Sequence, residues 1–137
     1  MIRIWAVLGM LALLGGCGPG EADIELSGTV VYDAYTSGTI RLIVAEEYTE
    51  ECGVFSCTGQ TPGETAATVD LERPGEFSIR ATVQENDGTS AVELLGYALG
   101  SSTVLWECEA GAALAFTAQN HRGIELVLEP GICPMRE

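Results

Sequence analysis

Short runs of alternating apolar and polar residues recur along this chain from residue 24 onward, and glycine, aspartate, asparagine and serine separate them. A period of two places the apolar side chains on one face of a β-strand, whereas no stretch carries the 3.6-residue period of an amphipathic helix. The pattern therefore predicts an all-β domain. The clearest run is 75–83, with Phe77, Ile79, Ala81 and Val83 on the apolar face.

Seven or eight short antiparallel strands at this spacing predict a small immunoglobulin-like β-sandwich. The run 91–99 is apolar on both faces, which is typical of a central strand. The segment 46–62 contains four glutamates and is predicted to be a long loop, while 85–88 and 119–123 read as turns. The predicted strands are 24–32, 39–45, 65–71, 75–83, 91–99, 103–108, 114–117 and 124–128.

The aromatic side chains of this domain are expected mainly in the core. Tyr97 and Trp106 fall within predicted strands, where aromatic residues usually pack inward. Tyr32, Tyr35 and Tyr48 lie near one end of the first predicted hairpin. We expect them to pack there, and a recognition surface built from loop tyrosines is the alternative.

The first residues of the chain have a different character from the rest. Arg3 precedes an uncharged run of 11 residues, 4–14. This layout is typical of a secretory signal, and the run is too short for a transmembrane helix, which needs about 20 residues. Leu14-Gly15-Gly16-Cys17 follows directly. It resembles the lipobox of bacterial lipoproteins, in which the cysteine thiol is joined to a diacylglycerol and the signal is cleaved before that cysteine.

The lipobox resemblance implies a cleaved signal at 1–16, a lipidated tether at 17–23 and a β-sandwich domain at 24–137. Each acyl chain contributes on the order of 0.8 kcal/mol per buried CH₂, so two or three chains anchor a protein stably. Gly18 follows Cys17 where an aspartate would resemble an inner-membrane retention signal, which favours the outer membrane. We expect a lipid-anchored protein of the bacterial cell envelope; an ordinary signal peptide with a spare thiol is the alternative.

The other four cysteines, Cys52, Cys57, Cys108 and Cys133, form an even set in an exported domain, which predicts two disulfides. Three pairings exist, and we favour Cys52–Cys57 with Cys108–Cys133. In the chain-entropy model these bonds contribute about 2 and about 3.5 kcal/mol. A four-thiolate zinc site is the alternative, but its ribbons prefer C-x2-C pairs to the C-x4-C spacing found here. We therefore expect no metal and no cofactor.

The charge of the chain is strongly negative. All six basic residues are arginines and there are 20 acidic residues, so removal of Arg3 with the signal leaves a formal net charge of −15. Such a surface repels phosphate backbones and anionic lipid headgroups. The charge predicts no nucleic-acid partner and a membrane attachment made by acyl chains alone.

Catalytic patterns are weak in this sequence. His121 is the single histidine and lies in the predicted turn 119–123, and no G-x-S-x-G nucleophile elbow is present. Chance pairs of carboxylates are expected among so many acids, as at Glu46/Glu47, Glu50/Glu51 and Glu107/Glu109. We therefore predict a protein that is not an enzyme. Calcium binding by the loops 46–51 and 85–87 is the first alternative, although the EF-hand pattern is missing, and a carboxylate-based hydrolase is the second.

The spacing of glycines and alternating hydrophobes resembles one known family. Residues 26–30 and 39–44 look like the opening of carboxypeptidase-regulatory-like, transthyretin-like domains, and 74–79 resembles their G-x-F-x-I strand. Residues 92–99 and 123–126 lie where later strands would be, while the cysteine loop and the Cys108–Cys133 segment depart from the pattern. The resemblance implies a non-catalytic structural or adhesive module. The lipid anchor, the sandwich pattern and the lack of a catalytic pattern together lead us to expect an envelope protein or glycan as its partner.

Overall fold

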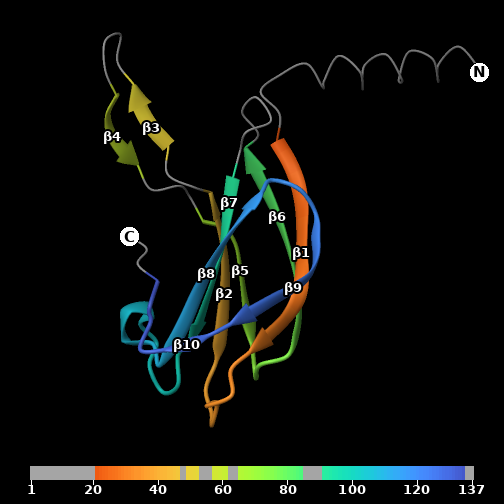
Figure 1. The fold of residues 1–137 in the computed structure, drawn as a ribbon, viewed down its shortest axis with the longest axis vertical. Helices are drawn as coiled ribbons and strands as arrows, with labels where there is room; N and C mark the ends of the chain where they lie inside the picture. Colours follow the sequence, from red (N-terminus) through yellow and green to blue (C-terminus); the bar gives the residue numbers. More distant parts are fainter. Residues whose placement is uncertain (1–20, 47–48, 53–56, 62–64, 85–90, 135–137) are drawn as a thin grey trace, which may run out of the picture.

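The computed structural model describes residues 21–46, 49–52, 57–61, 65–84 and 91–134. Within these ranges the chain is all-β, with one short 3₁₀ helix. Two sheets, one of three strands and one of five, pack face to face as a β-sandwich, and a separate two-stranded hairpin extends away from it (Figure 1). The predicted fold class and the number of sandwich strands are confirmed.

The smaller sheet has the strand order β6-β1-β9, with β1 at Glu21–Val31, β6 at Glu76–Gln84 and β9 at His121–Val127. β1 pairs with β6 antiparallel but with β9 parallel, so the expectation of a purely antiparallel sandwich is wrong for this pair. The parallel pair depends on Gly28, because a Cβ atom there would overlap the carbonyl oxygen of Ile124. Glycine therefore permits the close approach of the two backbones.

The larger sheet has the order β10-β8-β7-β2-β5 and is antiparallel throughout. β7 (Ala91–Ala98) lies in its middle and is buried along most of its length, as predicted for a central strand. β10 (Glu129–Pro130) reaches only the first residues of β8, Gly111 and Ala110. The remaining strands are β2 (Ile40–Glu46), β5 (Thr65–Leu71) and β8 (Ala110–Thr117).

The main hydrophobic core lies between the two sheets and follows the predicted alternation. The four alternating apolar residues of the run 75–83 are all buried in it, and so are Ile124, Leu126 and Leu128. A second buried cluster lies on the outer face of the larger sheet and consists of Ile43, Ala45, Leu95, Tyr97 and Leu99. This second cluster explains why β7 is apolar on both faces.

The prediction of a long loop over 46–62 is wrong in part, because the segment contains a β-hairpin. β3 (Thr49–Cys52) pairs antiparallel with β4 (Cys57–Thr61). Backbone pairing supplies the hydrogen bonds of this hairpin, and its sequence is too polar to show a hydrophobic alternation.

The predicted strand 103–108 is also wrong. Residues Leu105–Glu107 form the 3₁₀ helix η1, and the Trp106 side chain is 76% exposed instead of lying in the core. The Ser102 hydroxyl accepts a hydrogen bond from the Val104 amide at 3.0 Å, and the Glu107 amide donates to the Val104 carbonyl at 3.1 Å. These local bonds close a tight turn in place of a sheet ladder.

Candidate functional site

The end of the sandwich away from the start of β1 is built from four connecting segments (Figure 1). We call this surface the distal end and define it by residues 32–39, 72–75, 99–109 and 131–134. Hydrogen bonds join its segments, since the Leu99 amide donates to the Thr39 carbonyl at 2.9 Å and the Gly131 amide donates to the Glu109 carbonyl at 2.9 Å. The distal end is therefore one connected surface.

The two tyrosines of the distal end have a packing role. Tyr32 and Tyr35 are partly buried and pack against the main core. The Tyr35 hydroxyl lies 2.7 Å from the carbonyl oxygen of Glu72 and 3.0 Å from that of Gly38, so it ties segment 72–75 to its own turn. These residues therefore pack as expected, and Tyr48 lies outside the described residues.

A disulfide fastens the loop 99–109 to the C-terminal segment. Cys108 and Cys133 are bonded, with their Cα atoms 5.8 Å apart. Beneath this connection Tyr97 is fully buried, and its hydroxyl donates a hydrogen bond to the carbonyl oxygen of Pro134 at 2.8 Å. Leu105 packs against the same cluster from the loop. The outer face of the larger sheet thus holds the loop and the C-terminal segment together.

Trp106 stands out on this fastened loop because it is large, apolar and 76% exposed. The turn that carries it is fixed by a further hydrogen bond from the Ser102 hydroxyl to Glu107, at 3.0 Å. Burial of an apolar side chain of this size would stabilise the protein or a complex by about 2–3 kcal/mol, which the exposed side chain does not contribute. A preformed loop loses little entropy when a partner covers it. Both properties are typical of a contact residue in a binding surface.

Sequence reasoning missed Trp106 as a surface residue. The consecutive apolar residues Val104, Leu105 and Trp106 are typical of a buried strand. The preceding run Gly100-Ser101-Ser102-Thr103 is a turn signal that favours a loop instead, and it could have directed attention to the tryptophan.

The charges of the distal end, which carries Trp106, are mostly negative. Four acidic residues of the distal end are exposed, whereas Arg73 is its one basic residue. An aromatic ring among carboxylates attracts cationic groups, both over the ring face and beside the carboxylates. The acidic residues are Asp33, Glu72, Glu107 and Glu109.

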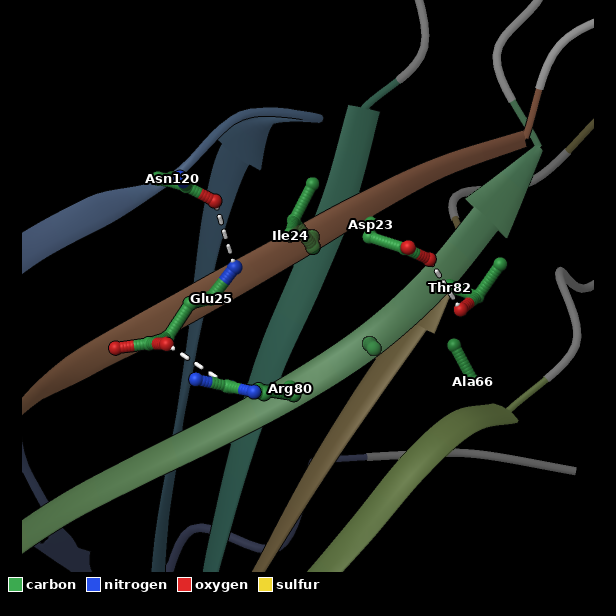
Figure 2. A pocket seen from close by; sticks show the side chains of 8 residues that line it. Asp23, Ile24, Glu25, Ala66, Arg80, Thr82 and Asn120 are labelled. Carbon is green, nitrogen blue, oxygen red and sulfur yellow. Dashed lines mark hydrogen bonds and ion pairs between the residues drawn. The ribbon is translucent and has the colours of Figure 1, made fainter. Parts of the chain in front are cut away.

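A pocket of about 570 Å³ lies at the other end of the smaller sheet (Figure 2). Its polar side chains pair across β1 and β6: Thr82 donates to Asp23 at 2.7 Å, and Arg80 contacts Glu25 at 3.1 Å. Asn120 accepts a hydrogen bond from the Glu25 amide at 2.9 Å. These polar groups are exposed and already bind one another. The pocket is therefore a solvent-exposed polar surface, and its carboxylates are not arranged as an acid–base pair.

The described residues of the weak catalytic patterns, His121, Glu107 and Glu109, have neighbours within the fold. His121 is the first residue of β9 rather than part of a turn, because the turn is confined to the residues just before it. Its Nε2 lies 3.2 Å from the Thr117 hydroxyl, and its ring centroid lies 5.0 Å from that of Phe116. Glu107 accepts a hydrogen bond from Ser102, whereas the carboxylate of Glu109 occupies the space that a Cβ atom at Gly100 would need.

Several predicted site residues fall outside the described part of the chain. Cys17 is one of them, and so is the acidic turn 85–87. Cys52 and Cys57 are directly opposite each other in the β3–β4 register, but their side chains are outside the description, so their disulfide stays a prediction. The side chains of Glu47, Glu50 and Glu51 also lie outside the described residues.

The described ranges contain neither a membrane-spanning helix nor a cluster of metal-ligating side chains. None of their helices has the length and apolar character needed to cross a bilayer. In the same ranges, no three or more histidine, cysteine, aspartate or glutamate side chains come together as a metal site.

Comparison with known proteins finds no similarity to report: no protein-family model, no curated protein and no solved structure matches the chain.

Proposed function

We propose that this protein is a lipid-anchored, non-enzymatic binding module of the bacterial cell envelope, attached to the outer membrane by acyl chains on Cys17. The lipobox-like residues 14–17 support the anchor. β1 begins at Glu21, so only residues 18–20 separate the first strand from the lipidated cysteine. Even a fully extended tether of this length spans roughly 14 Å, which keeps the sandwich close to the membrane.

This arrangement gives the two ends of the sandwich different environments. Figure 1 shows the start of β1 at one end of the sandwich and the distal end at the other. An anchor at Cys17 would hold the start of β1 nearer the membrane and leave the distal end farther from it. A partner that approaches from the aqueous space therefore meets the distal end first.

The observation that carries the binding role is the exposed Trp106 on its disulfide-fastened loop. Tryptophan is enriched among residues that dominate binding free energy, and rigid presentation increases the affinity that it can deliver. The exposed carboxylates of the distal end favour a protein partner with basic side chains.

Photocrosslinking in the native cells tests this role. A benzoylphenylalanine replaces Trp106, and in a matched control it replaces Ser78, an exposed residue on the outer face of the smaller sheet. We expect a discrete protein adduct from position 106 and none from position 78. The adduct should disappear when Cys17→Ser releases the protein from the membrane. Equal labelling at both positions, or an adduct with glycan alone, would contradict a protein-binding role for the distal end.

A further inference from the structure

The five-stranded sheet of the sandwich is wider than the three-stranded sheet, so part of its inner face is left uncovered. Leu114 of β8 is directly opposite Leu94 of β7, whose side chain is fully buried in the core. Leu114 therefore points toward the same inner face. It is nevertheless 37% exposed, because the three-stranded sheet does not extend over it.

A groove of about 380 Å³ occupies this place, between β8 and β9. On one side it is bounded by β9, the last strand of the smaller sheet. Among the described residues, β9 pairs only with β1, so its other edge presents backbone N–H and C=O groups that no described strand binds. The groove is lined by residues 111–114 and 125–127 together with Glu129 and Ile132.

An extended peptide segment fits both features of the groove. Laid beside β9 at the usual strand spacing of about 4.8 Å, it would bind the free backbone groups and become a fourth strand of the smaller sheet. Its inward side chains would then cover Leu114. A helix cannot supply the backbone pairing, because its own N–H and C=O groups are already used.

The side chains along the groove define the chemistry of that segment. Glu125 and Glu129 are exposed, and Val127 between them is 47% exposed. Cross-strand neighbours of opposite charge are favourable and like charges are unfavourable. The occupant should therefore carry lysine or arginine on its outward face, beside the glutamates, and apolar residues on its inward face, against Leu114. A second copy of this chain, with a net charge of −14, is a poor occupant.

We propose that the groove between β8 and β9 binds an extended, basic and apolar segment of a partner protein, which pairs with β9 as an added strand. The inference rests on the proposed binding role and specifies the partner's chemistry. The groove adjoins the distal end through Ile132, which precedes the disulfide-bonded Cys133. One partner can therefore cover Trp106 and insert a strand beside β9.

A synthetic peptide of alternating lysine and valine residues tests the proposal on the purified protein in detergent, with binding followed by isothermal titration calorimetry. We expect saturable binding, and a loss of about tenfold or more in affinity when Glu125→Lys reverses the charge beside β9. The matched control is Glu76→Lys, an equal charge change at an exposed position of β6, the opposite edge strand. It should leave the affinity within about twofold, since it lies away from the groove.

Methylation of backbone nitrogens separates strand pairing from simple charge attraction. An edge strand hydrogen-bonds only alternate residues of its partner. One peptide with N-methyl groups on the odd residues and another with them on the even residues should therefore differ, one binding and the other failing.

Absence of binding, equal binding by both methylated peptides, or equal effects of the two charge reversals would overturn strand addition. These results would leave the crosslinking test at Trp106 unaffected, so the binding role and its proposed chemistry can fail separately. Thermal unfolding of each variant checks that the exposed substitutions leave the domain folded.

Discussion

The hydroxyl of Tyr97, on the central strand β7, donates a hydrogen bond to the carbonyl oxygen of Pro134, 37 residues later in the chain, at 2.8 Å. The tyrosine side chain is fully buried, so the bond satisfies a donor that would otherwise be costly to remove from water. Together with the Cys108–Cys133 disulfide, it holds the C-terminal segment against the outer face of the larger sheet.

We expect Tyr97→Phe to lower the free energy of unfolding by about 1 kcal/mol, because the ring stays buried and the hydrogen bond is lost. Urea denaturation followed by far-UV circular dichroism measures this difference. The same substitution in a variant without the Cys108–Cys133 disulfide should have a smaller effect, since the C-terminal segment is then less firmly held. An unchanged midpoint in the disulfide-bonded protein would show that the bond contributes nothing.

Replacing Cys108 and Cys133 together by alanine should cost about 3.5 kcal/mol, because the bond closes a loop with a sequence separation of 25. The pair Cys52→Ala and Cys57→Ala serves as the comparison, with an expected cost of about 2 kcal/mol for its shorter loop. Thiol counting on the unreduced, unfolded protein should find none of the four domain cysteines free. Four free thiols would contradict both pairings.

Gly28→Ala should be among the most destabilising single substitutions in the domain, with a cost of about 3 kcal/mol or more. The new methyl group would overlap the backbone of Ile124, so the parallel β1–β9 pair would have to separate. Thr29→Ala, at the next position but exposed on the surface, should change the stability by about 0.5 kcal/mol. Similar midpoints for the two variants in chemical denaturation would contradict the close contact of the strands.

The ion pair between Arg41 and Asp70 gives the stability a weak dependence on pH. Arg41 Nε donates to Asp70 Oδ1 at 2.8 Å and Nη2 donates to Oδ2 at 3.0 Å. These hydrogen bonds and the positive charge lower the pKa of Asp70, although partial burial opposes them. The folded pKa is then below the unfolded value of about 3.9, so the pair stabilises the fold above that pH. The contribution is lost as the pH falls through the folded pKa.

Asp70→Asn should therefore reduce the stability at pH 7 by less than about 1 kcal/mol, because both side chains are partly exposed to solvent. The difference from the wild type should shrink once the pH falls below the folded pKa of Asp70. Denaturation midpoints of both proteins at neutral and strongly acidic pH measure this trend. An equal difference in stability between the two proteins at both pH values would exclude the ion pair as the cause of that difference.

The sandwich could be predicted from the sequence because its core depends on local alternation. The four apolar side chains of 75–83 are buried as the period of two requires, and 65–71 forms β5 within the predicted limits. The parallel pairing of β1 with β9 could not be predicted in this way. It depends on strands almost a hundred residues apart, and alternation indicates which face is buried but not which strand is adjacent.

The sequence pattern predicts the distal end least well, because the structure of this end depends on contacts between residues far apart in the sequence. Leu105 turns inward to the second cluster and Trp106 turns outward, although the two are equally apolar in a sequence pattern. The difference comes from the Ser102 turn and the disulfide to Cys133, which fix the backbone there. The width difference between the sheets, which exposes Leu114, is likewise a property of the assembled fold.

The most direct measurement of the proposed anchor is the mass of the N-terminal tryptic peptide from protein extracted from the native membranes with detergent. Trypsin cleaves after Arg41, so a processed chain yields the peptide 17–41. We predict that this peptide carries a diacylglyceryl group on Cys17 and that residues 1–16 are absent. An unmodified peptide 17–41, or a peptide 4–41 that retains the apolar run, would contradict lipid attachment and with it the placement of this domain at a membrane surface.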